Sequence, residues 1–187
     1  MPSAARSADG GRTWGPRFTL QPNIGKQNVM SVSFLRLRGS GEILLFFLVK
    51  NSLRDLKVYI RRSGDEARSW SPPQVVTADP SYHIMNNARV VQLRSGRILC
   101  PVCWCADAGR RGAKLRNVMF YSDDQGRSWS RGRGLVECPR RGAMEPGVVE
   151  LKDGRVLQVI RTQMGQIWFA WSHDQGDTWS EARPSGI

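Results

Sequence analysis

Residues 122–129 read SDDQGRSW, and residues 172–179 repeat nearly the same eight letters as SHDQGDTW. The pattern Ser-x-Asp-x-Gly-x-Ser/Thr-Trp also matches residues 7–14 in full, and it matches residues 63–70 except that Ala67 replaces the glycine. Successive motif aspartates are 56, 59 and 50 residues apart: Asp9, Asp65, Asp124 and Asp174. A period of this size is typical of repeat architectures in which each period folds as one structural unit.

The sequence between the motifs has the pattern of short β-strands. Apolar and β-branched runs alternate with turns rich in Gly, Asn and Asp, and no stretch keeps an apolar face at helical spacing. The predicted strands are residues 29–37, 43–49, 56–60, 74–77, 88–93, 98–104, 117–121, 134–138, 147–151, 156–160 and 166–171. We therefore predict one all-β domain over residues 1–187, with about three four-stranded antiparallel blades of a β-propeller.

The eight-residue motif is interpreted as a turn that fastens one strand to the next. Its Asp and Ser side chains can hydrogen-bond to nearby backbone groups, and its Gly permits a left-handed backbone. Its Trp supplies a large apolar anchor against the sheet. The alternative, a calcium loop, needs more carboxylates than the one or two in each copy. We therefore predict no metal site and no cofactor.

The motif is the Asp-box, or BNR repeat, and the chain resembles the sialidases (neuraminidases), which are six-bladed propellers. The resemblance is most specific in residues 144–161, MEPGVVELKDGRVLQVIR. This segment is similar to the sialidase stretch in which a catalytic Glu opens an inner strand and an Arg closes the next strand sixteen residues later. Glu145 and Arg161 have that spacing.

The spacing of Glu145 and Arg161 also has a physical interpretation. If residues 147–151 and 156–160 pair around the Asp153-Gly154 turn, the two side chains emerge at the same end of one hairpin. An Arg at such a place suits a carboxylate ligand, because its planar guanidinium can bind both oxygens. The alternative is an ordinary surface ion pair across a hairpin.

The resemblance implies an exo-acting, retaining glycoside hydrolase for a terminal acidic sugar such as sialic acid. Sialidases use a Tyr nucleophile; Glu145 would accept its proton, and Arg161 would be one of three arginines that bind the sugar carboxylate. The Tyr, the Asp acid/base and the other two arginines are expected outside this chain. The chain is thus interpreted as an inactive fragment, completed by missing blades or by self-association. The alternative is a non-catalytic Asp-box propeller that binds glycans or proteins.

Five further residues are predicted to contact the substrate. Matching the Gly turns places Asn87 where Glu145 stands one blade later, and His83 and Arg89 are near it in sequence. Asn28 and Lys50 flank the hairpin of the first blade in the same manner. The alternative for all five is that they are loop residues that satisfy turn backbone groups.

Composition limits the partners further. The formal net charge is +12, but the basic residues are scattered, nearly all are Arg, and no nucleic-acid-binding motif is present. No apolar run is long enough to span a bilayer. The four cysteines, Cys100, Cys103, Cys105 and Cys138, are interpreted as free buried thiols. The predicted partner is therefore an acidic carbohydrate, and the compartment, cytoplasmic or secreted, stays open.

Overall fold

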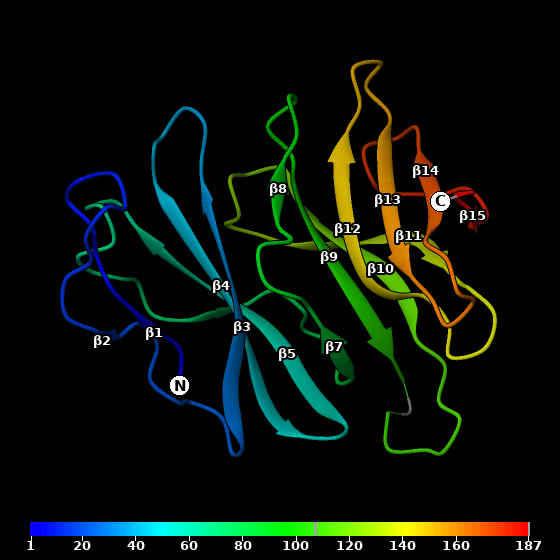
Figure 1. Ribbon diagram of the computed structural model, residues 1–187, viewed down its shortest axis with the longest axis horizontal. Coiled ribbons are helices and arrows are strands. Elements are labelled where there is room, and N and C mark those ends of the chain that lie inside the picture. Colours follow the sequence, from blue (N-terminus) through cyan, green and yellow to red (C-terminus); the bar gives the residue numbers. More distant parts are fainter. Residues whose placement is uncertain (107, 187) are drawn as a thin grey trace.

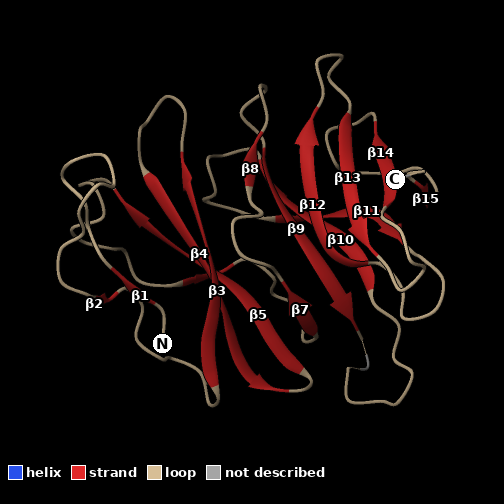
Figure 2. Ribbon diagram, in the orientation of Figure 1, coloured by secondary structure: helices blue, strands red, loops and turns tan. Residues whose placement is uncertain are grey.

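The protein is all-β, as the computed structural model of residues 1–106 and 108–186 shows (Figure 2). No helix occurs among these residues. The strands are β1 (Ser3–Ala4), β2 (Phe18–Thr19), β3 (Asn28–Arg36), β4 (Ile43–Ser52), β5 (Asp55–Ser63), β6 (Gln74–Val75), β7 (Tyr82–Ile84), β8 (Val91–Gln92), β9 (Ile98–Cys105), β10 (Arg116–Ser122), β11 (Ser130–Val136), β12 (Met144–Glu150), β13 (Val156–Arg161), β14 (Trp168–Ser172) and β15 (Arg183–Pro184). The prediction of an all-β protein is confirmed.

The strands form three antiparallel units that follow one another along the chain (Figure 1). The first unit is β3-β4-β5-β6, the second is β8-β9-β10-β11, and the third is β12-β13-β14-β15. β7 joins the first two units into one sheet, because it pairs antiparallel with β9 and touches β5 through a parallel bridge. β1 and β2 form a separate small sheet.

Two predicted strands of the second unit differ from the structure. Of the predicted strand 88–93, only Val91–Gln92 is extended in a ladder, because the backbone turns at Ala88, where φ is 52° and the amide bonds to Val32 O of the first unit. The fourth strand lies at Ser130–Val136 rather than at 134–138. Both shifts depend on contacts between units, which a local pattern does not encode.

Each Asp-box folds as a self-contained turn. In the third copy, Ser122 Oγ accepts a hydrogen bond from Gly126 N at 2.7 Å. Asp124 accepts bonds from Ser128 N at 2.9 Å and from Ser128 Oγ at 2.6 Å. The second copy keeps this pattern although Ala67 replaces glycine and adopts φ of 60°. The carboxylate of the Asp-box is therefore occupied by its own loop, as expected for a structural turn.

Two of the Asp-box tryptophans, Trp129 and Trp179, pack against the preceding unit rather than only against their own sheet. Trp129, which follows β10 of the second unit, meets Phe46 of β4 edge-on, with ring centroids 5.6 Å apart. Trp179 of the third unit packs with Leu99 and Met119 of the second. Trp14 is 65% exposed, and the described residues contain no unit before it. Thus the motif also fastens one unit to the next.

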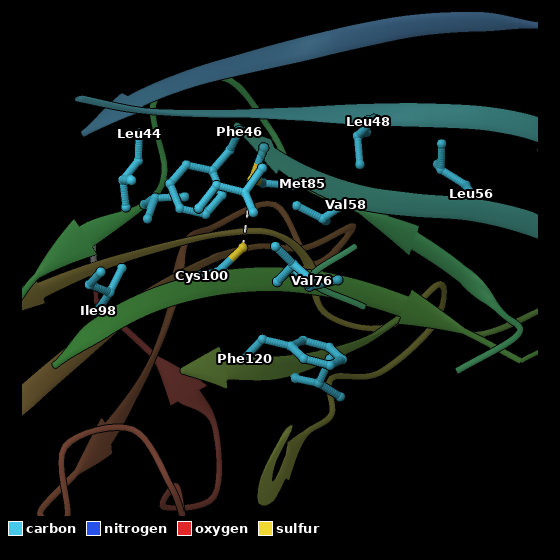
Figure 3. Close-up of a cluster of buried hydrophobic side chains, with 14 of the residues drawn as sticks. Leu44, Phe46, Leu48, Leu56, Val58, Val76, Met85, Ile98, Cys100 and Phe120 are labelled. Atoms are coloured by element: carbon cyan, nitrogen blue, oxygen red, sulfur yellow. Dashed lines mark hydrogen bonds between the residues drawn. The ribbon is translucent and has the colours of Figure 1, made fainter. Parts of the chain in front are cut away.

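The largest buried cluster lies between the first and second units (Figure 3). Phe46 and Leu48 of β4 face Cys100 of β9 and Phe120 of β10 across this core. All four side chains are at most 3% exposed. The first and second units are therefore held together by continuous apolar packing, which fixes the position of the second unit against the first.

Acid should weaken the Asp-box turns. Burial raises the pKa of Asp124, but hydrogen bonds from Ser128, Ser122 and Arg127 lower it by more, to about 2. The unfolded carboxyl titrates near ~3.9, so the stabilisation is complete above about pH 4 and is lost as pH falls toward about 2. Urea midpoints measured from pH 5 to pH 2 should fall more steeply for the wild type than for Asp124→Asn. Parallel curves would contradict this interpretation of the turn.

Candidate active site

Glu145 and Arg161 lie together at one end of the β12–β13 hairpin. Met144 is the ladder partner of Arg161, which places Glu145 beside the last residue of β13. Arg161 Nη1 donates a hydrogen bond to Glu145 Oε1 at 2.7 Å. The side chains are 64% and 38% exposed, respectively. The pair therefore borders solvent, and it is accessible to a ligand.

The backbone at Glu145 is in an unusual conformation. The ladder shifts register between Met144 and Gly147, and Glu145 has φ of 48° in the left-handed region. Ser31 and Ala88, at 57-residue intervals before it, have φ of 54° and 52°. Left-handed backbone is uncommon for residues other than Gly and is often retained at functional sites. The left-handed residue recurs in each unit, but only the third unit places an ionisable side chain there.

A cavity of about 580 Å³ opens beside the pair. Its lining comes from β12, β13, the loop after β13, and one residue that precedes β8: Glu145, Gly147, Val159, Arg161, Thr162, Gly165, Gln166, Ile167 and Arg89. The cavity therefore spans the second and third units, and two guanidinium groups and one carboxylate face it.

Arg89 reaches the cavity because Gly147 has no side chain. A Cβ on Gly147 would lie 3.1 Å from Arg89 Nη1, so a larger residue would displace the guanidinium. Arg89 Nε is buried and has no hydrogen-bond partner among the described residues. The cavity thus carries one more positive than negative charge. An anionic ligand would satisfy both arginines, since Arg161 has further donors besides the one bonded to Glu145.

Four other sequence-predicted site residues do not line this cavity. His83 is fully buried, packs edge-on against Phe120, and has Nε2 3.3 Å from Asp79 Oδ2 but out of line for a hydrogen bond. Burial lowers the pKa of His83, so the imidazole is held neutral.

Asn28 and Lys50 are ladder partners in the first unit, and the Lys50 ammonium lies 5.9 Å from the Tyr82 ring centre. Asn87 is exposed, and its neighbour Ala88 has the backbone conformation of Glu145. A substrate contact by Asn87, His83, Asn28 or Lys50 stays a prediction.

The loop after Arg161 is the part of the site that sequence reasoning missed. Thr162 Oγ1 donates to Gln166 O at 3.0 Å and accepts from Met164 N at 3.1 Å, which closes the loop on itself. Gly165, with φ of 79°, supplies the turn. A Gly four residues after a strand that ends in a candidate ligand-binding Arg is the signal that points to this loop.

None of the tyrosines lines the cavity within the described part of the chain. Tyr59 stacks on Phe47, and Tyr121 lies under Arg97, whose guanidinium carbon is 4.2 Å from the ring centre. Tyr82 lies beneath Lys50, as described above. The cavity therefore offers a carboxylate and two arginines, but no phenol.

The four cysteine thiols are buried in the protein. All four cysteines are buried and free, and burial raises the pKa of Cys103 to about 12 and that of Cys138 to about 11. Residues 1–106 and 108–186 contain no group of three or more His, Cys, Asp and Glu side chains placed to hold a metal ion. The same residues form no apolar helix with the length that a bilayer crossing requires.

Comparison with known proteins points to one superfamily. A family model described as a BNR repeat-like domain matches residues 3–187. A sialidase from Micromonospora viridifaciens is 29% identical over 178 residues, which cover 81% of this chain and 26% of that protein. The chain therefore spans about a quarter of the length of this curated relative.

Solved structures of sialidases share the fold. A Hadza microbial sialidase superposes with a TM-score of 0.79 and 20% identity, covering 96% of this chain and 39% of the other. Trypanosoma rangeli sialidase in complex with sialic acid superposes with a TM-score of 0.70 and 21% identity, covering 96% of this chain and 32% of the other. At these identities the similarity establishes the fold.

Proposed function

Residues 3–187 belong to the BNR repeat-like domain family, within the sialidase superfamily, and from this premise we propose that the Glu145–Arg161 cavity binds the carboxylate of a terminal acidic sugar such as sialic acid. The three units would be blades of a six-bladed β-propeller. The observation that carries the proposal is the convergence of Arg161 and Arg89 on one solvent-open cavity beside Glu145.

The charges of the cavity support this ligand class. Arg161 holds Glu145 through one N–H of Nη1, so four N–H donors, on Nε, Nη2 and Nη1, are left for a sugar carboxylate. Arg89 adds a second guanidinium from the neighbouring unit. Charge-assisted hydrogen bonds to a carboxylate are shorter and stronger than neutral ones. A neutral sugar would leave the excess positive charge unsatisfied.

For hydrolysis, we propose that Glu145 acts as the base that removes the phenol proton of a tyrosine nucleophile. The phenolate oxygen then attacks the anomeric carbon while an Asp acid, which like the tyrosine would lie outside residues 1–187, protonates the departing oxygen and the glycosidic bond breaks. Water, deprotonated by the same Asp, later releases the sugar with retention, and the phenol and the acid are restored. The tyrosine would come from residues other than 1–187, in a longer chain. The lining of the cavity, which contains no phenol, supports this division of the site.

The binding half of the proposal is tested by titrating the protein with 3'-sialyllactose and with lactose in a calorimeter. We expect measurable binding of the acidic sugar only, and a loss of about 10- to 100-fold in affinity for Arg161→Ala, the range expected for a charge-assisted bond. Arg155→Ala is the matched control, because Arg155 lies at the other end of the same strand and pairs with Asp153. Equal affinities of wild type and Arg161→Ala would overturn the proposal.

The catalytic half is tested with a fluorogenic sialoside. The protein by itself should bind the substrate without turnover above the buffer rate. Turnover that disappears in one of the variants Tyr59→Phe, Tyr82→Phe or Tyr121→Phe would place the nucleophile within this chain and contradict the proposed division of the site.

A further inference from the structure

A second group of cations lies on the same side of the molecule as the candidate active site. Two adjoining cavities of about 410 and 510 Å³ share Arg110, Gly112 and Ala113 in their linings. The first is also lined by Arg111, Lys114 and Arg116, and the second by Arg140, Arg141 and Gln163. We call the basic side chains of these two cavities the basic rim: Arg110, Arg111, Lys114, Arg116, Arg140 and Arg141.

Two loops that are distant in sequence form the basic rim because Gly142 permits a very close approach. Gly142 has φ of 97°, and a Cβ there would lie 2.0 Å from Leu115 O. Leu115 N donates to Arg141 O, and Ala143 N donates to Leu115 O, both at 2.9 Å. The loop between β9 and β10 is thereby joined to the loop between β11 and β12. The position of the cations is thus built into the backbone.

Most charges of the basic rim have no acidic partner among the described residues. Arg116 forms an ion pair with Glu137. Arg110, Arg111, Lys114 and Arg141 form none in the part of the chain that the structure describes. Residues 106–116 have four basic residues and one acid, Asp107, in the sequence. Clustered like charges raise the local concentration of anions and favour ligands of opposite sign.

The basic rim and the candidate active site share one loop. Arg140 Nη1 donates to Gln163 O at 3.0 Å. Gln163 lines the basic cavity, whereas its loop neighbours Thr162, Gly165 and Gln166 line the cavity of Glu145. In Figure 1 the loops that follow β9, β11 and β13 lie in the lower right part of the view, whereas the β3–β4, β8–β9 and β12–β13 turns lie at its upper edge. A bound sugar polymer that leaves the cavity of Glu145 can therefore pass over this loop into the basic cavity.

We propose that the basic rim is a second anion-binding site, which holds the additional acidic groups of a multiply charged glycan whose terminal sugar occupies the Glu145 cavity. The inference rests on the proposed function for the identity of that terminal sugar. A single-stranded nucleic acid is disfavoured, because such ligands are bound by stacking on aromatic side chains and neither basic cavity has an aromatic residue in its lining.

The test compares a ligand with one carboxylate, 3'-sialyllactose, with a ligand with four, α2,8-linked tetrasialic acid. We expect the wild type to bind the tetramer at least about 10-fold more tightly at 50 mM NaCl, and to lose most of this difference at 500 mM, because salt screens exposed charges. The combined variant Arg110→Gln, Arg111→Gln and Arg141→Gln should lose the tetramer preference. It should bind sialyllactose within about 2-fold of the wild type, since none of the three substituted arginines lines the Glu145 cavity and salt screens exposed charges that do not contact the ligand.

The matched control removes three exposed arginines from Asp-box turns: Arg12→Gln, Arg68→Gln and Arg127→Gln. It has the same net charge as the rim variant and should keep the tetramer preference. A heparin tetrasaccharide distinguishes sulfate from carboxylate as the preferred group, and a 16-nucleotide RNA tests the alternative polymer. Tighter binding of the RNA than of the tetramer, lost in the rim variant, would overturn the assignment to a glycan.

Two results separate this inference from the proposed function. If Arg161→Ala leaves sialyllactose binding intact, the proposed function fails, whatever the basic rim does. If Arg161→Ala weakens sialyllactose but the rim variant and the Asp-box control bind the tetramer equally, the basic rim is not a ligand site. Melting temperatures of all variants, measured first, restrict the comparison to folded proteins.

Discussion

Gly142→Ala is expected to destabilise the fold by about 2–5 kcal/mol, the largest effect on stability that the structure predicts for any glycine. A left-handed backbone at a residue with a side chain costs about 1–2 kcal/mol, and forcing extra atoms into a packed site costs about 1–3 kcal/mol more. Both apply here, because Gly142 has φ of 97° and the added Cβ would lie 2.0 Å from Leu115 O. Urea unfolding of the purified variant measures the loss.

Gly154→Ala is the matched control for this prediction. Gly154 has φ of 89°, but a Cβ there would meet nothing within 4 Å. Only the cost of the backbone conformation remains, so we expect a loss of about 1–2 kcal/mol. Equal losses in the two variants would show that the contact between the loops around Leu115 and Gly142 is not tight in solution. The geometry of the basic rim would then lose its support.

Trp129→Ala is expected to cost about 3 kcal/mol, at the lower end of the range for removing a large aromatic side chain from a core. The side chain is only partly buried, but it packs into the largest apolar cluster and meets Phe46 of the preceding unit. The loss therefore acts on the contact between two units. The midpoint of thermal or urea unfolding measures it.

Trp14→Ala tests the same motif position without that contact. Trp14 is 65% exposed, so its removal should change stability by less than about 0.5 kcal/mol, as for other surface substitutions. If both tryptophan variants lost the same stability, the Asp-box would act through its own turn alone. The interpretation of the motif as a fastener between units would then be wrong.

The sequence predicts those features that depend on short stretches. The Asp-box turns form because Ser, Asp and Gly residues within eight positions satisfy one another, as the bonds of Ser122 and Asp124 show. The β12–β13 hairpin follows from its Asp-Gly turn and apolar runs. Such features are local, so a single sequence carries enough information to predict them.

Features that depend on contacts between units were not predictable in the same way. The sequence names Arg89 as a candidate contact, but its entry into the cavity from the second unit depends on the room that Gly147 leaves in the third. Ala88, rather than Asn87, shares the backbone conformation of Glu145, since the second unit has one residue fewer between its left-handed residue and its Gly turn. The packing of Trp129 on Phe46 likewise joins residues that are far apart in sequence. These arrangements arise only when the units pack together.

The most direct test of the central claim is a crystal structure of this protein with 3'-sialyllactose bound. The account predicts the sugar carboxylate in the Glu145 cavity, with its oxygens about 2.7–2.9 Å from guanidinium nitrogens of Arg161 and with Arg89 facing the same group. A sugar bound outside this cavity, or inside it with the carboxylate turned away from both arginines, would contradict the account.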